Sequence, residues 1–287
     1  MAKEKTIDTL VEDIYNIFEC EEEVKIKEED LERLVKDVVE SVTTSVKERE
    51  RSRGNLRLSL IGHPDRKVWY TVREGDKVGK EKLAGKDKIK FLYGHILESL
   101  LVFLSRTAGH TVTDEQKTVK VGGVVGHQDA KVDGVLVDFK SASSYGFKKF
   151  KDKTIHSDDP FGYIAQLSAY AKANNLDEAG FVAIDKSTGE ICYCPVHSME
   201  MINAEERIEY LKQTVKSDVP PPRCYSDIPD GKSGNYKLHI GCVYCSYKRD
   251  CWSDSNGGQG LKKFNYSTGP RYLTRIGRMP DVEEIYD

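Results

Sequence analysis

The sequence predicts an α/β fold, in which strands pair as hairpins and helices pack against them. Two segments, 126–140 and 180–196, place apolar alternating runs on either side of a turn signal, which is typical of β-hairpins. Segment 88–108 is apolar on most sides of a helix, and a helix start signal precedes 161–174. The chain has 287 residues, 38% of them hydrophobic, so it can hold one large or two smaller domains.

Two helices are expected near the N-terminus, because apolar residues keep helical spacing at 7–18 and again at 31–42. We expect them to pack on the rest of the fold, with docking of a replication or recombination protein as the alternative. The run from Arg51 to Gly54 marks a boundary, and Pro220 to Pro222 form a stiff break. Three regions follow: a helical region at 1–53, a core at 54–217, and a cysteine-containing basic region at 218–287.

The helix predicted at 88–108 carries a carboxylate, Glu98, within an apolar run. A lone carboxylate there is costly unless it has a partner or a metal ion. A narrow polar stripe that faces solvent is the alternative. Gly94, one turn earlier, would let another backbone approach closely, and Gly109 is expected to end the helix.

The hairpin predicted at 126–140 brings acidic residues together. Asp133-Gly134 signals a two-residue turn, and folding the chain there sets Asp129 opposite Asp138. Because side chains alternate between the faces of a strand, Lys140 shares the face of these two acids. Opposed residues have Cβ atoms about 4.5–5.5 Å apart, and two carboxylates that close repel each other unless a cation lies between them. Mg²⁺ fits that role; ordinary exposed acids on a solvated hairpin face are the alternative.

A helix and a second hairpin follow. Asp159 suits the N-cap and Pro160 the first position of a helix that runs to Asn174. Gln166 and Tyr170 lie four residues apart on one face of it, a pair that is also common on surface helices. The second hairpin turns at 186–189, and another helix is expected near 204–216.

Four short motifs occur in order over about residues 91–170: Gly94-x-x-x-Glu98, Gly126-x-x-Asp129, Asp138-x-Lys140 and Gln166-x-x-x-Tyr170. Together they resemble the motifs of PD-(D/E)xK nucleases, specifically the RecB-like exonuclease branch. The resemblance implies a restriction-endonuclease-like fold, a mixed central sheet flanked by helices, for the core at 54–217. Many RecB-like members carry a metal-binding histidine where this chain has Glu98, and a glutamate there is closer to phage and viral alkaline exonucleases.

The same resemblance assigns the metal ligands: Glu98, Asp129, Asp138 and the backbone carbonyl of Phe139. It implies that Lys140 positions the attacking water or stabilises negative charge, and that Gln166 and Tyr170 orient the site or the DNA strand. Such a site has a physical basis, because a bound Mg²⁺ or Mn²⁺ lowers the pKa of its water and neutralises charge on the phosphate. A fixed lysine adds stabilisation where charge grows in the transition state.

The chain has seven cysteines, an odd number, with no secretory signal and no apolar membrane span. These features predict a reducing cytoplasm, that of the host if the protein is viral, and no membrane association. Cys242-x₂-Cys245-x₅-Cys251 has a spacing that suits a metal or cluster held by thiolates. Cys20, Cys192 and Cys194 are expected to be free thiols.

The cysteine triplet resembles the C-terminal motif of iron–sulfur RecB-like nucleases, including the CRISPR-associated adaptation nucleases. Those typically take their first cysteine from upstream of the nuclease core, where this chain has Asp65. Cys224 is the nearest upstream thiol and is our choice of fourth ligand for a [4Fe-4S] cluster. A four-thiolate Zn²⁺ site and a set of free cysteines are the alternatives.

The net charge of −3 does not by itself indicate nucleic-acid binding. A basic loop directly follows the first hairpin, and we expect its lysines to contact DNA: Lys148, Lys149, Lys151 and Lys153. Residues 261–280 carry cations and aromatics with no acidic residue, which suits either a groove for a DNA strand or a solvated tail.

These features predict a Mg²⁺- or Mn²⁺-dependent deoxyribonuclease with a structural iron–sulfur cluster. We expect a phage-type exonuclease that acts on single-stranded or duplex DNA ends in replication, recombination or repair. A non-catalytic nucleic-acid-binding module on the same fold is one alternative, which the presence of Asp129, Asp138 and Lys140 argues against. A restriction-type endonuclease is the other, which the Gln166 motif and the cysteine triplet argue against.

Overall fold

The computed structural model describes residues 5–21, 23–47, 54–75 and 85–286. These residues form two compact units, which we treat separately. Unit 1 comprises the described residues within 1–51, 56–62 and 83–210, and unit 2 those within 52–55, 63–82 and 211–287. The predicted boundary run at 51–54 lies mostly outside the described residues, and the three-region division stays a prediction. No helix in the described part of the chain is both long and apolar enough to cross a membrane.

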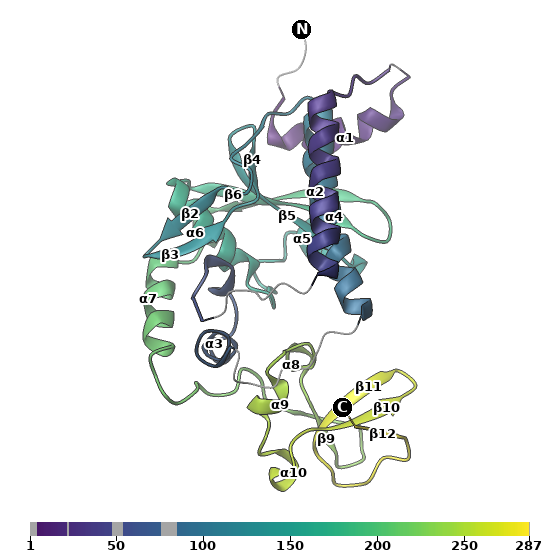
Figure 1. Cartoon of the computed structure of the whole chain (residues 1–287), viewed down its shortest axis with the longest axis vertical. Helices are drawn as coiled ribbons and strands as arrows, with labels where there is room; N and C mark the ends of the chain where they lie inside the picture. Colours follow the sequence, from purple (N-terminus) through teal and green to yellow (C-terminus); the bar gives the residue numbers. More distant parts are fainter. Residues whose placement is uncertain (1–4, 22, 48–53, 76–84, 287) are drawn as a thin grey trace. The chain divides into compact units, whose positions relative to one another are not determined.

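Unit 1 is built on a five-stranded sheet with the strand order β1-β4-β5-β6-β7 (Figure 1). The strands are β1 (Val112–Thr113), β4 (Ala130–Val132), β5 (Val135–Ala142), β6 (Glu178–Asp185) and β7 (Ile191–His197). β5 and β6 run parallel and the other neighbours antiparallel, so the sheet is mixed. The predicted mixed α/β architecture, a central sheet flanked by helices, is confirmed.

The hairpin of β4 and β5 has the predicted turn and register. Asp133 (φ 50°) and Gly134 (φ 86°) both adopt positive φ, as the two central residues of a type I′ turn require. Ala130 pairs with Val137 and Val132 with Val135. These four side chains belong to the main apolar core, together with residues of α1, α4, β6 and β7. The opposite face of β5 is therefore the one that carries Asp138 and Lys140.

The first predicted helix packs on this sheet as expected. A 3-10 turn (Ile7–Thr9) leads into α1 (Leu10–Glu19), and the side chains of Leu10 and Ile14 are fully buried in the core. His110 fastens α1 to the hairpin turn, because its ring lies between two carboxylates: Nδ1 is 2.6 Å from Asp133 Oδ2, and Nε2 is 3.1 Å from Asp13 Oδ2. The imidazole is completely buried.

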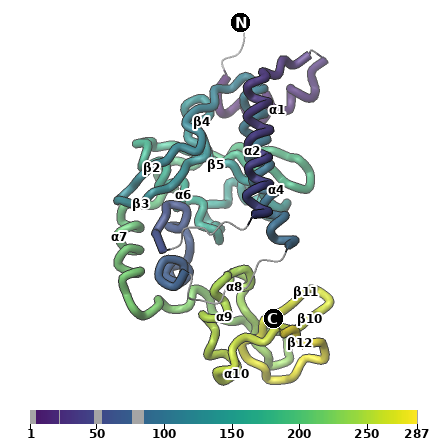
Figure 2. Tube along the Cα trace, viewed as in Figure 1, coloured from purple at the N-terminus to yellow at the C-terminus, as the bar shows by residue number. Residues whose placement is uncertain are grey.

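The second predicted helix, α2 (Glu28–Val46), runs beside α4 (Gly85–Thr107) (Figure 2). Ion pairs join it to its surroundings, Arg33 to Glu115 at 3.0 Å and Arg106 of α4 to Asp30 at 3.5 Å. None of its residues is fully buried, and it leaves an apolar stripe exposed: Leu31, Val35, Val39, Val42 and Val46. Docking of a partner on these helices stays a prediction.

The helix α4 is less buried than its composition predicts. Its 23 residues span about 35 Å, and its buried residues, Leu101, Leu104 and Ser105, all lie near its C-terminal end. Phe91 in its first half is 59% exposed. Gly109 ends the helix as expected: with φ 89°, it donates its N–H to the Arg106 carbonyl, and the N–H of His110 reaches the Ser105 carbonyl, a Schellman motif.

Two predicted details of the next segments were wrong. Of the four lysines expected in a loop, all but Lys153 lie on a helix, α5 (Ser144–Lys151). Ser143 caps this helix, because its side chain accepts a hydrogen bond from the N–H of Gly146. The following helix, α6 (Tyr163–Asn174), begins at Tyr163 rather than at Pro160. Gly162 precedes it with φ 76°, and a Cβ there would lie 2.2 Å from the backbone of Gly62, so the chain turns before the helix can start.

The remaining elements of unit 1 include two hairpins, a 3-10 turn and the first part of one more helix. β6 and β7 form the second predicted hairpin, and α7 (Ala204–Thr214) is the predicted last helix. A short hairpin of β2 (Thr118–Val121) and β3 (Val124–His127), turned at Gly122-Gly123, was not predicted. A 3-10 turn, Leu58–Leu60, packs against β3 and α6.

Unit 2 combines short helices with a second, antiparallel five-stranded sheet in the order β12-β10-β11-β9-β8. This sheet was not predicted from the sequence. Its strands are β8 (Ile228–Pro229), β9 (Tyr236–Lys237), β10 (Lys262–Tyr266), β11 (Gly269–Arg275) and β12 (Glu284–Ile285). The helices are α3 (Asp65–Trp69), a π-helical turn (Tyr70–Glu74), α8 (Ile240–Val243), α9 (Lys248–Cys251) and α10 (Ser255–Gly258).

Candidate active site

Asp138 lies in the middle of β5, with its side chain 1% exposed. Lys140 stands two residues further on the same face, and its ammonium forms an ion pair with the Asp138 carboxylate. Apart from that ion pair, neither Asp138 oxygen has a hydrogen-bond partner in the described part of the chain. A buried carboxylate with so few partners is an energetically costly group, and it is suited to bind a cation.

Asp129 lies beside Asp138, just before β4. Its Oδ2 accepts a hydrogen bond from the N–H of Phe139 at 2.8 Å, and its backbone carbonyl accepts one from the N–H of Gln116 at 2.9 Å. The paired register ends at Ala130, so Asp129 is not a ladder partner of Asp138 as drawn from the sequence. Burial raises the pKa of Asp129 well above its usual value, and the charges of Asp138 and Glu98 raise it further.

Glu98 completes the acidic group from α4. The side-chain amide of Gln116 donates a hydrogen bond to it, with Nε2 3.1 Å from Oε1. The pKa of Glu98 is raised to about 7, and burial is the largest cause. The charge of Lys140 opposes this rise, and the charge of Asp138 adds to it. The three carboxylates therefore interact electrostatically, although α4, β5 and the segment before β4 supply them from different parts of the sequence.

Gly94, which lies one turn before Glu98, was expected to face another backbone. It faces a side chain instead. A Cβ at Gly94 would lie 3.4 Å from Oγ of Ser141, the residue that follows Lys140 in β5. A small residue at this position therefore allows α4 to lie close to the strand that carries Asp138 and Lys140.

Lys140 is held in its charged form. Burial disfavours the ammonium, but the carboxylates of Asp138 and Asp129 outweigh burial and raise the pKa of Lys140. The ammonium also lies 4.9 Å from the centroid of the Tyr163 ring, a cation–π distance. The lysine is thus a fixed positive charge next to the acids.

Gln166 and Tyr170 meet on α6, as their spacing predicts. Gln166 Nε2 donates a hydrogen bond to the Tyr170 hydroxyl at 3.1 Å. The pKa of Tyr170 is raised to about 12, and burial is the largest cause. The Gln166 hydrogen bond opposes this rise, and the charges of Asp138 and Asp129 add to it. The phenol is therefore neutral, and it lies close enough to both acids for their charges to affect its pKa.

Gly126, the glycine of the second motif, has a steric reason to lack a side chain. A Cβ at this position would lie 2.7 Å from Cβ of Leu58 and 3.0 Å from Cε1 of Tyr170. The glycine therefore lets β3 approach α6 and keeps the Tyr170 ring against the strand that leads to Asp129.

The donor set suits a hard divalent cation, because carboxylate and carbonyl oxygens are the ligands that Mg²⁺ and Mn²⁺ prefer. Asp138 has few partners, and burial together with the neighbouring carboxylates raises the pKa values of Glu98 and Asp129, so the charged forms of these acids lack compensation. Within the described residues, no three His, Cys, Asp or Glu side chains are already arranged as ligands of one ion.

Two of the four lysines expected to contact DNA are paired with acids. Lys149 forms an ion pair with Asp158 at 2.7 Å, and Lys151 forms one with Glu190 at 2.5 Å. Lys148 and Lys153 are exposed. All four follow β5 directly in the chain, so they lie near the acidic site in sequence, and their contact with DNA stays a prediction.

Two residues of the site were not predicted, Gln116 and Tyr163. Gln116 contacts both Glu98 and Asp129, and it does so from a loop in which Asp114 and Gln116 adopt positive φ (54° and 47°). Nothing in the local sequence indicates such a loop conformation. Tyr163 could have been suspected, because it lies one helical turn before Gln166 and so shares its side of α6.

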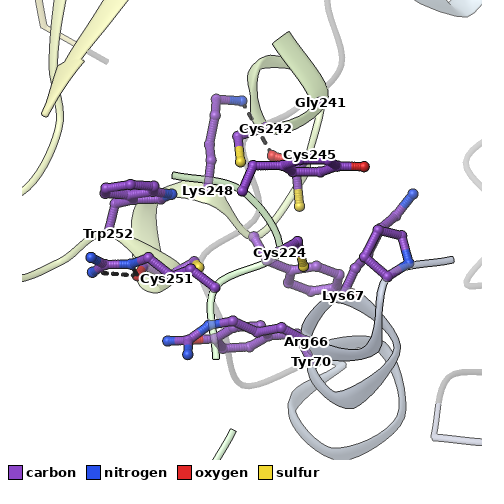
Figure 3. A pocket seen from close by; sticks show the side chains of 14 residues that line it. Arg66, Lys67, Tyr70, Cys224, Gly241, Cys242, Cys245, Lys248, Cys251 and Trp252 are labelled. Atoms are coloured by element: carbon purple, nitrogen blue, oxygen red, sulfur yellow. Dashed lines mark hydrogen bonds between the residues drawn. The ribbon is translucent and has the colours of Figure 1, made fainter. Parts of the chain in front are cut away.

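In unit 2, four cysteines line one cavity: Cys224, Cys242, Cys245 and Cys251. Figure 3 shows their side chains around a shared space, with Arg66, Lys67 and Lys248 nearby. Burial first, and then the charges of the other three thiols, raise the pKa of Cys242 to about 12. Burial lowers the pKa of Lys67, whereas Cys245 and Cys224 raise it. The cavity therefore joins the predicted triplet to the predicted fourth cysteine.

The other cysteines lie elsewhere. Cys20 follows α1 and is exposed, while Cys192 and Cys194 lie on β7, half-buried and buried. Burial raises the pKa of Cys192 to about 12 and that of Cys194 to about 11. None of the seven cysteines forms a disulfide.

No protein-family model matches the chain, and no curated protein matches its sequence. Among solved structures, SSO0001 is similar with a TM-score of 0.42 and 17% identity, over 76% of this chain and 93% of that one. The alkaline exonuclease LHK-Exo from Laribacter hongkongensis has a TM-score of 0.37 and 15% identity, over 57% and 90%. A phage-related exonuclease from Haemophilus somnus 129PT has a TM-score of 0.36 and 18% identity, over 57% and 92%. Similarity at these levels assigns no function to this chain.

Proposed function

We propose that this protein is a metal-dependent deoxyribonuclease that hydrolyses phosphodiester bonds. The observation that carries the proposal is the buried Asp138, paired with Lys140 and close to two more carboxylates whose pKa values are raised. A merely structural acid would be expected to have its hydrogen bonds satisfied. Glu98, Asp129, Asp138 and the Phe139 carbonyl would hold Mg²⁺ or Mn²⁺, which supplies an activated water and neutralises charge on the phosphate.

The protein's own residues have distinct roles in this proposal. Lys140 is charged and fixed, so it can stabilise the negative charge that grows on the phosphate. Gln116 holds Glu98 and the Asp129 backbone in place. Gln166 orients the Tyr170 hydroxyl, and this neutral phenol can donate a hydrogen bond to the strand. Lys148, Lys149, Lys151 and Lys153 would contact the phosphates of the DNA.

We propose further that the enzyme is an exonuclease acting on DNA ends, as the resemblance of the Gln166-x-x-x-Tyr170 motif suggests. The test uses the full chain with Mg²⁺ or Mn²⁺ on end-labelled linear DNA, single-stranded and duplex, and on closed circles of both kinds. An exonuclease shortens the linear DNA and leaves the circles intact. Cleavage of circles would favour a restriction-type endonuclease, and binding without cleavage of any substrate would favour a non-catalytic module.

For unit 2, we propose that Cys224, Cys242, Cys245 and Cys251 hold a [4Fe-4S] cluster. The four thiols share one cavity, and thiolates are ligands of iron–sulfur clusters as well as of zinc. The cluster would have a structural role, tying the Cys224 segment to the segment of α8 and α9.

Anaerobic purification of the full chain tests the cluster, with iron, acid-labile sulfide and zinc measured against protein. The proposal predicts brown protein with iron and sulfide, and colourless protein with stoichiometric zinc would replace the cluster by a zinc site. Cys224→Ala should lower the iron content, whereas Cys192→Ala, at a half-buried thiol of unit 1, should not. Full cluster retention in Cys224→Ala would redirect the fourth ligand to Cys20 or Asp65.

A further inference from the structure

Phe161 is a large apolar side chain held out into solvent next to the acidic site. It lies in the segment between α5 and α6, and it is 61% exposed. An exposed phenylalanine on its own is ordinary. This one differs because its ring is part of a continuous series of aromatic contacts that leads to Lys140.

The Phe161 ring stacks on the Tyr163 ring, with centroids 5.4 Å apart and an angle of 27° between the planes. The Tyr163 ring in turn contacts the Lys140 ammonium, 4.9 Å from its centroid. Lys140 is ion-paired with Asp138. Only one aromatic ring therefore separates Phe161 from Lys140, through two contacts of 5.4 and 4.9 Å.

The segment that carries Phe161 is fixed in place. The Asp159 carboxylate accepts hydrogen bonds from the N–H groups of Phe161 (3.3 Å), Gly162 (2.8 Å) and Ile164 (2.8 Å). Gly162 adopts φ 76° directly against the backbone of Gly62. The exposed ring is thus presented by a preorganised turn, so little conformational entropy is lost when a flat ligand stacks on it.

We propose that Phe161, backed by Tyr163, is a binding site for an unpaired nucleobase of single-stranded DNA adjacent to the scissile phosphate. The inference rests on the proposed nuclease function and adds the strand type that the site accepts. A base inside a duplex has both faces covered by its neighbours, whereas an unpaired base has a face free to stack. Aromatic stacking platforms are a common means of holding single strands without regard to sequence.

The surroundings of Phe161 offer a cation and a second ring. Lys149 of α5 forms an ion pair with Asp158, three residues before Phe161. Tyr145, on the first turn of α5, is 76% exposed and lies 5.2 Å from the Lys149 ammonium, so a second aromatic ring is available on this side.

The direct test is fluorescence of 2-aminopurine placed in turn at each of the terminal positions of a short single-stranded oligonucleotide. The protein is the full chain with Asp138→Asn, which prevents cleavage. We expect quenching at one or two adjacent positions, loss of that quenching with Phe161→Ala, and its retention with Phe161→Trp. Phe161→Leu keeps an apolar side chain without a ring and should also lose the quenching. Phe18→Ala, at another exposed phenylalanine of unit 1 (71% exposed), should have no effect.

Cleavage kinetics separate this inference from the proposed function. In the otherwise wild-type chain, Phe161→Ala should raise KM for single-stranded DNA about ten-fold or more, in line with the loss of one stacked base, while kcat changes little. If the wild type does not cleave any DNA, the proposed function fails. If the wild type cleaves and Phe161→Ala keeps both its KM and the local quenching, the stacking site is wrong. Equal quenching at the end of a blunt duplex would overturn the preference for an unpaired base.

Discussion

The Lys140 ammonium and the Asp138 carboxylate form an ion pair two residues apart on one face of β5. Asp138 is buried, the Lys140 side chain is only 18% exposed, and Asp138 has no other polar partner in the described residues. Removing either member leaves the other as an uncompensated buried charge. The two residues are thus coupled in folding as well as in the proposed chemistry.

Asp138→Asn and Lys140→Ala should each abolish or nearly abolish DNA cleavage. Asp138 is a proposed metal ligand, and loss of a fixed charge such as Lys140 typically lowers kcat by about 10²–10³-fold. Cleavage of end-labelled DNA with Mg²⁺ and with Mn²⁺ measures the effect, and a gel-shift assay should show that DNA binding persists. Lys120→Ala, at an exposed lysine of β2, is the matched control. Normal cleavage by either site variant would refute the assignment.

Gln116→Ala should weaken the response to metal without unfolding the protein. Its amide holds Glu98 and its backbone N–H holds the Asp129 carbonyl, and the substitution removes only the side-chain bond. We expect the Mg²⁺ concentration for half-maximal activity to rise about ten-fold, the size typical of losing a partner that orients a ligand. Gln116→Glu, which adds a negative charge next to Glu98, should be worse. An unchanged metal response in both variants would show that Gln116 does not position Glu98.

Gly126→Ala should destabilise unit 1. The new Cβ would meet Leu58 Cβ at 2.7 Å and Tyr170 Cε1 at 3.0 Å, and Leu58 is fully buried and unable to move aside. Overpacking of this kind costs about 1–3 kcal/mol. Gly85→Ala is the control, because no heavy atom lies within 4 Å of its added Cβ. Thermal unfolding by circular dichroism compares the two, and equal melting temperatures would contradict the packing described for Gly126.

The metal-free protein should lose stability as the pH rises from about 4.5 to about 7. The pKa of Glu98 is raised from 4.5 to about 7, so over this range the folded state binds more protons than the unfolded state, and the free energy of unfolding falls with pH. The loss should be on the order of 1–3 kcal/mol. The raised pKa of Asp129 acts in the same direction.

Urea denaturation in EDTA at several pH values tests this expectation. Glu98→Gln should show a shallower loss of stability with pH, because it cannot release the proton. Added Mg²⁺ should also flatten the dependence by stabilising the charged carboxylates. A variant that follows the wild-type curve throughout would show that Glu98 is not the titrating group.

The hairpin that carries Asp138 was predictable because its determinants are local. Asp133-Gly134 fixes the turn, the turn fixes the register, and the register places Asp138 and Lys140 on one face. Gln116 was not predictable, because its contact with Glu98 depends on a loop with two positive φ values and on the packing of α4. Local signals predict local geometry, whereas contacts between distant segments depend on how those segments pack.

The start of α6 shows how a correct signal can be misplaced. Asp159 does satisfy N–H groups at the helix entry, but it reaches Gly162 and Ile164 across a turn, so the helix starts later than Pro160 suggests. The close approach of Gly62 to Gly162 sets that turn, and it joins residues a hundred positions apart. The sheet of unit 2 was missed for another reason, because β8, β9 and β12 have two residues each and show no alternation.

The buried His110 ring, held between Asp13 of α1 and Asp133 of the hairpin turn, has a consequence for how the protein can be shortened. Deleting the chain through Asp13 would remove one of the two carboxylates that contact the buried His110 ring. It would also expose the core in which Leu10 and Ile14 are buried. The other contact of His110 is with Asp133, so the lost interaction would affect the turn of the hairpin that follows Asp129 and carries Asp138. The segment from Ile7 to Glu19 is therefore a structural support of the hairpin that carries Asp138.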